Sequence, residues 1–310
     1  MSEPGEHAGA PRTWLLAGAS GFLGSGLSAD LRGRGIPVRR LVRSDPSSTG
    51  EHRWDPDSGT LDASVFDDVA VVVNLAGVSV QKRWTGTNRA AILDSRVNTT
   101  RTLADALAKL TDPPVFVSQS ATGFYPKNTG TRLSEADTTP SDGFLGQATV
   151  GWEAAADSAR AAGVRVVHPR TGVVLDRSGG ALPLLSLPFK AGLGVPLGSG
   201  KQVMPVVGLA DWLAAIHFIA EHGEISGPVN VVIPERVTNL AFTDALAAAV
   251  HRPRIPFVRV PGPPLELVLG GFSSELLDSV DIAPQVLLDA GFVFSTPTIR
   301  PLLDAALAKH

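Results

Sequence analysis

The chain has 310 residues, of which 44% are hydrophobic and 18% charged, a globular composition with no stretch near the roughly 20 apolar residues needed to span a bilayer. We therefore expect a cytoplasmic protein without a membrane partner, and the net charge of -3 without a basic block argues against nucleic acid. The absence of cysteine excludes thiolate chemistry, and the seven histidines lack zinc-motif spacing, so we expect no metal.

The first half of the chain predicts alternating strands and helices. Residues 1–12 are rich in glycine, proline and polar side chains, which predicts a flexible tail. Apolar runs predict strands, and apolar residues at helical spacing predict helices. The expected strands are 13–17, 36–42, 69–75, 115–118 and 164–169, and the expected helices are 22–31, 88–110 and 142–162. This alternation predicts an α/β fold, a Rossmann-type doubly wound parallel sheet.

After Thr171 the pattern changes, because glycine and proline interrupt it repeatedly. We expect a helix at 211–221, a strand at 228–233 that rejoins the main sheet, a helix at 240–250 and a proline-rich, mostly helical remainder. The resulting division is a dinucleotide-binding domain of 13–175, joined by 205–235, and a smaller C-terminal substrate lobe of 176–204 and 236–310.

Three glycines, Gly18, Gly21 and Gly24, follow the first predicted strand and open the first predicted helix. Glycine lets the backbone turn sharply and lets a pyrophosphate approach main-chain N–H groups at the positive end of a helix. The segment therefore predicts a dinucleotide-binding loop. Its expected contact residues are Gly18, Ser20, Gly21, Phe22, Leu23 and Gly24.

The end of the second predicted strand indicates which dinucleotide is bound. An acidic residue there usually binds the 2′-hydroxyl of NAD, but this chain has Arg43 and Ser44. An arginine would attract the 2′-phosphate of NADP, so the sequence favours NADP(H) over NAD(H). The alternative is that Arg43 is a solvated charge at a strand end.

Further motifs resemble a known family. With the glycine loop, the segments Asn74-Leu-Ala-Gly77, Ser118-Gln-Ser120 and Pro169-Arg-Thr-Gly172 resemble the extended short-chain dehydrogenase/reductases. More narrowly, the chain is similar to their atypical, NAD-dependent epimerase-like (sugar-nucleotide epimerase-like) branch. The markers of that branch are Trp54-Asp-Pro56, Ser95-Arg-Val-Asn98, Pro196-Leu-Gly-Ser-Gly200, Met204-Pro205, Asp211, Gly227-Pro-Val-Asn230 and Ala290-Gly-Phe-Val-Phe294.

The resemblance implies roles for several residues. It assigns Asn74, Ala76 and Gly77 to the wall of the cofactor site and Ser120 to the position of the catalytic serine. It places Thr171, Gly172 and Val173 beside the nicotinamide. A fold of this kind supports many chemistries, so the resemblance alone does not define the reaction.

The Tyr-x-x-x-Lys pair of short-chain dehydrogenases is absent. The family pattern places Leu145 and Thr149 where that tyrosine and lysine would stand, and Tyr125 is the single tyrosine of the chain. Tyr125 lies in the loop after the predicted strand 115–118, where the resemblance implies a substrate cleft, so we expect it to transfer a proton or bind a carbonyl. The alternative is an ordinary loop aromatic.

A second departure lies in the segment 203–211. The branch usually has tryptophans and a histidine here, and this chain has smaller residues. If the segment faces substrate, the pocket becomes wider and more apolar. Its expected lining residues are Val203, Met204, Val206 and Gly208, and we expect Asp211 to cap the following helix.

These observations favour an NADP(H)-dependent oxidoreductase that acts on a carbonyl or enone of a bulky apolar small molecule, with Ser120 and Tyr125 as catalytic residues. One alternative is a non-redox isomerase, cyclase or dehydratase with a structural or vestigial cofactor. Another is a dinucleotide-binding sensor without turnover. We expect a monomer or homodimer.

Overall fold

A nine-stranded sheet organises the structure, a computed structural model that describes residues 12–80, 84–255, 258–260 and 277–308. The strand order is β12-β8-β6-β5-β1-β2-β3-β4, and β7 also pairs with β8. All pairs are parallel except β3 with β4. The strands are β1 (Thr13–Ala17), β2 (Val38–Val42), β3 (Glu51–Asp55), β4 (Thr60–Leu61), β5 (Val69–Asn74), β6 (Val115–Ser118), β7 (Ser120–Ala121), β8 (Val166–Thr171) and β12 (Gly227–Val231).

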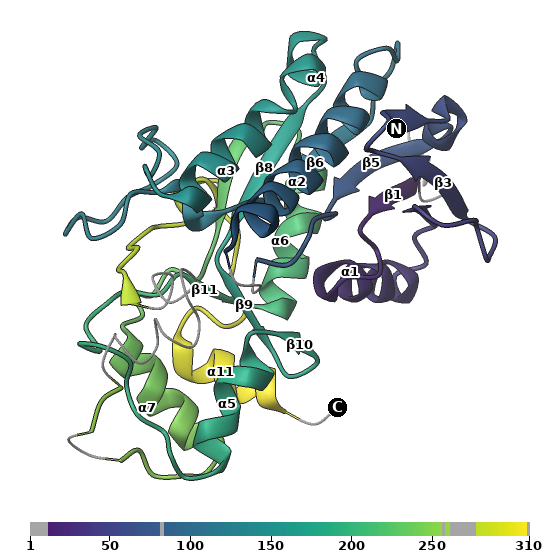
Figure 1. Ribbon diagram of the computed structural model, residues 1–310. Coiled ribbons are helices and arrows are strands. Elements are labelled where there is room, and N and C mark those ends of the chain that lie inside the picture. The colour runs from purple at the N-terminus through teal and green to yellow at the C-terminus, as the bar shows by residue number, and fades with distance from the viewer. Residues whose placement is uncertain (1–11, 81–83, 256–257, 261–276, 309–310) are drawn as a thin grey trace, which may run out of the picture.

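Helices cover both faces of this sheet, because alternate side chains of each strand point to opposite sides. In β1, Leu16 packs in a core with α1 (Phe22–Gly33) and α6 (Leu209–Glu221). Leu15 packs in a second core with α2 (Gly86–Leu107) and α4 (Asp157–Ala161), and α3 (Phe144–Ala154) lies beside α2 (Figure 1). This is the Rossmann-type arrangement expected from the sequence.

A second lobe lies beyond one end of the main sheet (Figure 1). It contains a small sheet, β10-β9-β11, together with helices from the C-terminal half of the chain. Its elements are β9 (Val173–Asp176), β10 (Gly179–Gly180), β11 (Val206–Gly208), α5 (Leu182–Lys190), α7 (Asn239–Ala249) and α11 (Ile299–Leu307). The short helix α10 (Gln285–Asp289) instead contacts β12 of the main sheet.

Two of the differences from the predicted elements lie in the main sheet and its covering helices. The helix expected at 142–162 is divided into α3 and α4, and the division turns the fully buried Ala156 and Ala159 toward the sheet. The sequence analysis did not predict β3, in which Trp54 is 3% exposed, or its partner β4. The expected tail, 1–12, lies outside the described residues except for Arg12.

Asp211 differs from its expected role as a helix cap. Gly208 is the N-cap of α6, and the Asp211 carboxylate instead accepts four hydrogen bonds from the C-terminal part of the chain. Ser295 donates from its backbone N and Oγ, both at 2.7 Å, and Thr296 donates from its backbone N at 2.9 Å and from Oγ1 at 2.6 Å. This buried carboxylate therefore joins α6 to the segment before α11.

The parallel register brings the ends of several strands into line. Ala17 of β1 pairs with Asn74 of β5, and Asn74 pairs with Ser118 of β6. Further along the sheet, Arg170 of β8 lies between Ser120 of β7 and Asn230 of β12. Ligands of open α/β sheets bind at this carboxyl edge, so the site begins here. Within the described residues no helix is both long enough and apolar enough to cross a membrane.

Candidate active site

The glycine loop between β1 and α1 is shaped by two glycines that have no room for a side chain. Gly18 has a φ of +79°, and a Cβ there would lie 2.6 Å from the carbonyl carbon of Leu75. A Cβ on Gly24 would overlap the carbonyl oxygen of Gly18. These two glycines therefore hold the loop tightly against α1 and the end of β5.

Gly21 differs from these two, because it is exposed and a Cβ there would meet only the Gly18 oxygen, at an ordinary 3.5 Å. Gly21 is also the N-cap of α1, with no side-chain cap and no acidic residue in the first turn. The N–H groups at the start of α1 are thus available to an anion. Ser20 is exposed beside them, and Phe22 and Leu23 are partly buried.

The end of β2 carries an arginine without a partner. Arg43 and Ser44 are exposed, and Arg43 forms no hydrogen bond or ion pair with any described residue. The two arginines before it are engaged: Arg39 donates to backbone carbonyls, and Arg40 lies 3.2 Å from a carboxylate oxygen of Glu51. Arg43 directly follows β2, and β2 pairs with β1, so this guanidinium, which has no partner among the described residues, extends from the strand next to the one that leads into the glycine loop.

Asn74 has a buried, architectural position. Its Oδ1 accepts a hydrogen bond from the Ala76 N at 3.1 Å, and its Nδ2 donates to Thr100 Oγ1 at 3.0 Å. Thr100 also accepts from Trp152 Nε1 at 3.0 Å. Asn74 therefore shapes the turn after β5, and the surface that can face a cofactor comes from the partly exposed Ala76 and the exposed Gly77.

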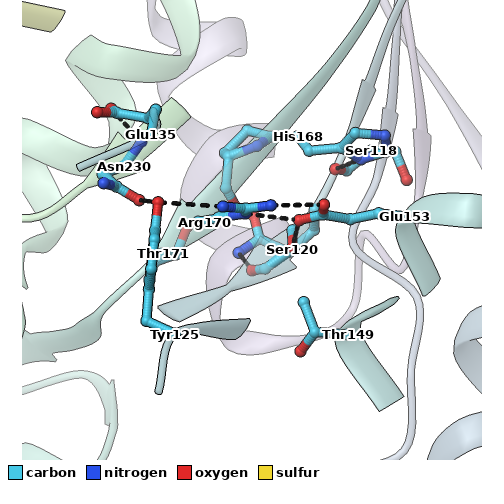
Figure 2. A network of polar contacts seen from close by, with 12 residues as sticks. Ser118, Ser120, Tyr125, Glu135, Thr149, Glu153, His168, Arg170, Thr171 and Asn230 are labelled. Carbon is cyan, nitrogen blue, oxygen red and sulfur yellow. Dashed lines mark hydrogen bonds and ion pairs between the residues drawn. The ribbon is translucent and has the colours of Figure 1, made fainter. Parts of the chain in front are cut away.

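A buried ion pair lies beside Ser120. Arg170 donates to both carboxylate oxygens of Glu153, from Nε at 2.8 Å and from Nη2 at 2.9 Å, and Ser120 Oγ donates to Glu153 Oε1 at 2.6 Å (Figure 2). Burial opposes ionisation of Glu153, but the hydrogen bonds and charge of Arg170 outweigh it and lower the pKa of Glu153. The Ser120 proton is thus directed to a carboxylate.

Tyr125 continues this network on the other side of Arg170. Its hydroxyl accepts from Arg170 Nη1 at 3.1 Å and donates to Asn230 Oδ1 at 2.9 Å (Figure 2). The side chain is 0% exposed, and burial raises the pKa of the phenol. The expectation that Tyr125 transfers a proton or binds a carbonyl stays a prediction, and in this structure the phenol is enclosed and donates its proton to Asn230 inside the protein.

Two further buried groups complete this region. Glu135 accepts from the backbone N atoms of Asn230, at 2.8 Å, and Gln285, at 3.1 Å, and burial raises its pKa. His168 has Nδ1 3.2 Å from the Ser118 carbonyl oxygen and Nε2 2.9 Å from an Arg160 nitrogen. Because arginine can only donate, His168 Nε2 accepts and Nδ1 carries the proton.

The segment after β8 is closely packed. Thr171 is 7% exposed, and its Oγ1 accepts from Trp212 Nε1 at 3.1 Å. A Cβ on Gly172 would lie 2.6 Å from the Pro205 oxygen, so this turn is pressed against the start of β11. Val173 is partly buried, so Gly172 and Val173 are the accessible part of the segment expected near the nicotinamide.

The expected substrate-pocket residues do not line an open surface. Val203, Met204 and Val206 are 3%, 8% and 0% exposed, and Gly208 is also buried. Met204 and Val206 belong to the core around α6, because β11 pairs with β9 inside the second lobe. The wider, more apolar pocket inferred from these positions therefore stays a prediction, and the structure packs all four residues in the interior.

Leu145 and Thr149, at the positions of the missing tyrosine and lysine, lie on one face of α3, since Thr149 Oγ1 donates to the Leu145 carbonyl at 2.7 Å. Glu153 follows one turn later on the same face. Sequence reasoning missed Glu153 and Arg170. An arginine inside the buried run 166–171 was the available signal, because a buried charge requires a partner. No cluster of metal-binding side chains is found in the described part of the chain.

Comparison with known proteins identifies the family of the chain. A protein-family model for the NAD dependent epimerase/dehydratase family matches residues 14–232, and a domain of unknown function, DUF1731, matches residues 260–306. The chain belongs to the NAD dependent epimerase/dehydratase family. This match confirms the resemblance to the atypical, epimerase-like short-chain dehydrogenase/reductases that the sequence predicted.

Relatives of this epimerase family match nearly the whole chain. The epimerase family protein Mb2239 of Mycobacterium bovis is 39% identical over 95% of this chain and 97% of its own length. Human epimerase family protein SDR39U1 (isoform 2), whose crystal structure contains NADPH, is 31% identical, with a TM-score of 0.84 over 95% of this chain and 98% of that chain. A nucleoside-diphosphate sugar epimerase from Corynebacterium glutamicum is 30% identical, with a TM-score of 0.80 over 96% of this chain and 58% of that chain.

Proposed function

We propose that the protein is an NADP(H)-dependent oxidoreductase that reduces a carbonyl or enone of a small molecule, or catalyses the reverse reaction. The observation that carries the proposal is the uncapped start of α1 beside the unpaired guanidinium of Arg43. The first suits a diphosphate and the second a 2′-phosphate. The NADPH in the human relative supports the same choice.

The chain's contribution to this reaction is to bind and orient. Gly21 leaves room for a diphosphate, and Ala76, Gly77, Gly172 and Val173 form the accessible wall toward the nicotinamide. The bound dinucleotide supplies or accepts the hydride. The Ser120 and Tyr125 hydroxyls donate inside the protein, so the accompanying proton comes from water, the cofactor ribose or the substrate.

A second candidate function is a non-redox isomerase, cyclase or dehydratase. The enclosure of Tyr125 favours it, because the site then lacks an open phenol to accompany hydride transfer. We do not extend the proposal to a bulky, apolar substrate, because Val203, Met204 and Val206, which suggested such a substrate, are buried. A dinucleotide-binding sensor would bind the cofactor without product formation.

The test is to incubate the protein with NADPH and a panel of carbonyl and enone compounds, and with NADP⁺ and the matching alcohols. Nicotinamide absorbance and product mass are followed together. Product with an equivalent absorbance change supports the oxidoreductase, and product without it identifies the non-redox enzyme. Tight NADPH binding without product identifies the sensor, and failure to bind NADPH or NADH contradicts all three.

A further inference from the structure

Arg96 of α2 uses only some of its hydrogen-bond donors within the described part of the chain. Its Nη1 donates to the carbonyl oxygens of Val78, at 3.0 Å, and Ile92, at 2.9 Å. The guanidinium carbon lies 5.0 Å from the centre of the Trp152 ring. These contacts hold the group in place. They leave the donors on Nε and Nη2 without a partner among the described residues.

Arg96 is partly exposed. The side-chain polar atoms that are both buried and unpaired in the described chain belong to Gln119, Ser158 and Asp281, so the Arg96 nitrogens are not sealed in the interior. Nor does a carboxylate compensate the charge: burial alone lowers the pKa of Arg96 to about 10, with no opposing acidic neighbour.

Other partly buried arginines show how this chain satisfies a structural guanidinium. Arg170 has its bidentate partner Glu153. Arg165 donates to four backbone carbonyls at the end of α6 and the turn after it. Arg96 has neither arrangement. A fixed cation with unused, accessible donors is suited to an oxyanion, because charge-assisted hydrogen bonds are about twice as strong as neutral ones.

Arg96 also lies at the wall of the proposed cofactor site. A Cβ built on Gly77 would be 3.4 Å from the guanidinium carbon, and Gly77 belongs to the turn after β5 that packs against the glycine loop. Ser95 holds the same turn, since its Oγ accepts from the Val78 N at 3.0 Å. The two residues fix the turn, and Arg96 adds a positive charge beside it.

We propose that Arg96 binds an oxyanion, a phosphoryl or carboxylate group, of a ligand in the dinucleotide cleft. The inference rests on the proposed function in one respect, that the cleft binds a dinucleotide. The anion has two possible sources: the diphosphate of the dinucleotide, or an acidic group of the substrate.

The experiment compares Arg96→Gln with the parent and with Arg101→Gln, which removes an exposed arginine of the same helix. In the first arm, NADPH and NADH are titrated by nicotinamide fluorescence at low and high salt. If Arg96 contacts the diphosphate, Arg96→Gln weakens both cofactors by about tenfold or more and reduces the salt dependence of binding. Arg101→Gln changes neither.

In the second arm, the protein saturated with NADP⁺ is titrated with inorganic phosphate, pyrophosphate and benzoate at constant ionic strength, and thermal stabilisation is measured. If Arg96 contacts the substrate, at least one anion stabilises the parent and Arg101→Gln, and this effect is lost in Arg96→Gln while cofactor affinity holds. Circular dichroism checks folding. Should Arg96→Gln fail to fold, Arg96→Lys replaces it, with an expected weakening of about threefold to tenfold because lysine lacks the planar fork.

The proposal is overturned if a folded Arg96 variant keeps parental affinity for both cofactors and no anion effect depends on Arg96. A parent protein that binds neither NADPH nor NADH would instead contradict the proposed function, whatever Arg96 does. The two failures are therefore distinguishable.

Discussion

Arg43 presents a full positive charge to solvent at the end of β2, whereas Arg53 on the neighbouring strand pairs with Asp45 at 2.7 Å. Replacing Arg43 by alanine should lower affinity for NADPH by about tenfold or more and leave NADH unchanged, because only NADPH carries a 2′-phosphate. Fluorescence titration of both cofactors measures the change. Arg53→Ala is the control. The assignment would be contradicted by a parent protein that binds NADPH and NADH equally well, or by an Arg43→Ala variant that still prefers NADPH.

Tyr125 leads to a prediction about stability. Tyr125→Phe removes the hydroxyl that joins Arg170 to Asn230 and leaves two buried polar groups without this partner. We expect a loss of about 1–3 kcal/mol in the free energy of unfolding and unchanged NADPH affinity. Urea denaturation and cofactor titration measure the two quantities.

The opposite result for Tyr125→Phe would be informative. A proton donor at the reacting atoms contributes about 10²–10⁴-fold to turnover. Parental stability together with a loss of that size would mean that Tyr125 leaves its enclosure during the reaction.

At this scale the sequence predicted the residues whose role depends on local chain order. Gly18 and Arg43 directly follow the ends of β1 and β2, and Gly24 lies in the first turn of α1, while their roles toward a cofactor stay predictions. Partners distant in sequence were not predictable: Tyr125 meets Asn230 105 residues later. Such a pairing depends on which strands lie side by side, which residue patterns alone do not define.

At the scale of elements, we expect Gly21 of the glycine loop to matter for cofactor binding and Gly24 to matter for folding. Gly21→Val places a β-branched side chain at the open start of α1, where a diphosphate would lie, and the structure has room for its Cβ. We expect undetectable NADPH binding with an unchanged circular dichroism spectrum. Gly24→Val is the matched variant, and its Cβ overlaps the Gly18 carbonyl, so it should lower the melting temperature instead.

Two results would contradict this division of roles. Undiminished NADPH binding by Gly21→Val would place the cofactor elsewhere. A Gly24→Val variant as stable as the parent would mean that the loop rearranges without cost.

The elements themselves were predictable where hydrophobic periodicity is strong. The central strands β1, β5 and β6 are mostly apolar along their length because both faces of the sheet are covered by helices. β3 was missed because its sequence, Glu51–Asp55, buries only Trp54 and has no apolar run. β3 pairs with both β2 and the edge strand β4, so it is defined by pairing more than by composition.

For the whole molecule, the buried His168 predicts a pH dependence of stability. Burial lowers its pKa from 6.5 to about 4, so between these values the unfolded chain binds a proton that the folded protein excludes. This contribution to stability is fully present above about pH 6.5 and is lost as the pH falls toward 4. Thermal denaturation between pH 7 and pH 4 measures it.

His168→Gln isolates this effect from those of other groups. Glutamine can still donate to the Ser118 carbonyl and accept from Arg160, but it does not titrate. As the pH falls, the melting temperature of the parent should therefore decrease more than that of the variant. A constant difference across this range would show that His168 is not the responsible group.

The four hydrogen bonds that Asp211 accepts from Ser295 and Thr296 also have a consequence for synthesis of the chain. During translation, α6 leaves the ribosome more than eighty residues before the donors that satisfy its buried carboxyl group. Until they arrive, the polar Asp211 side chain lacks these partners, and burying this face of α6 is costly. We therefore expect native closure of the core around α6 to follow synthesis of the segment that carries Ser295 and Thr296.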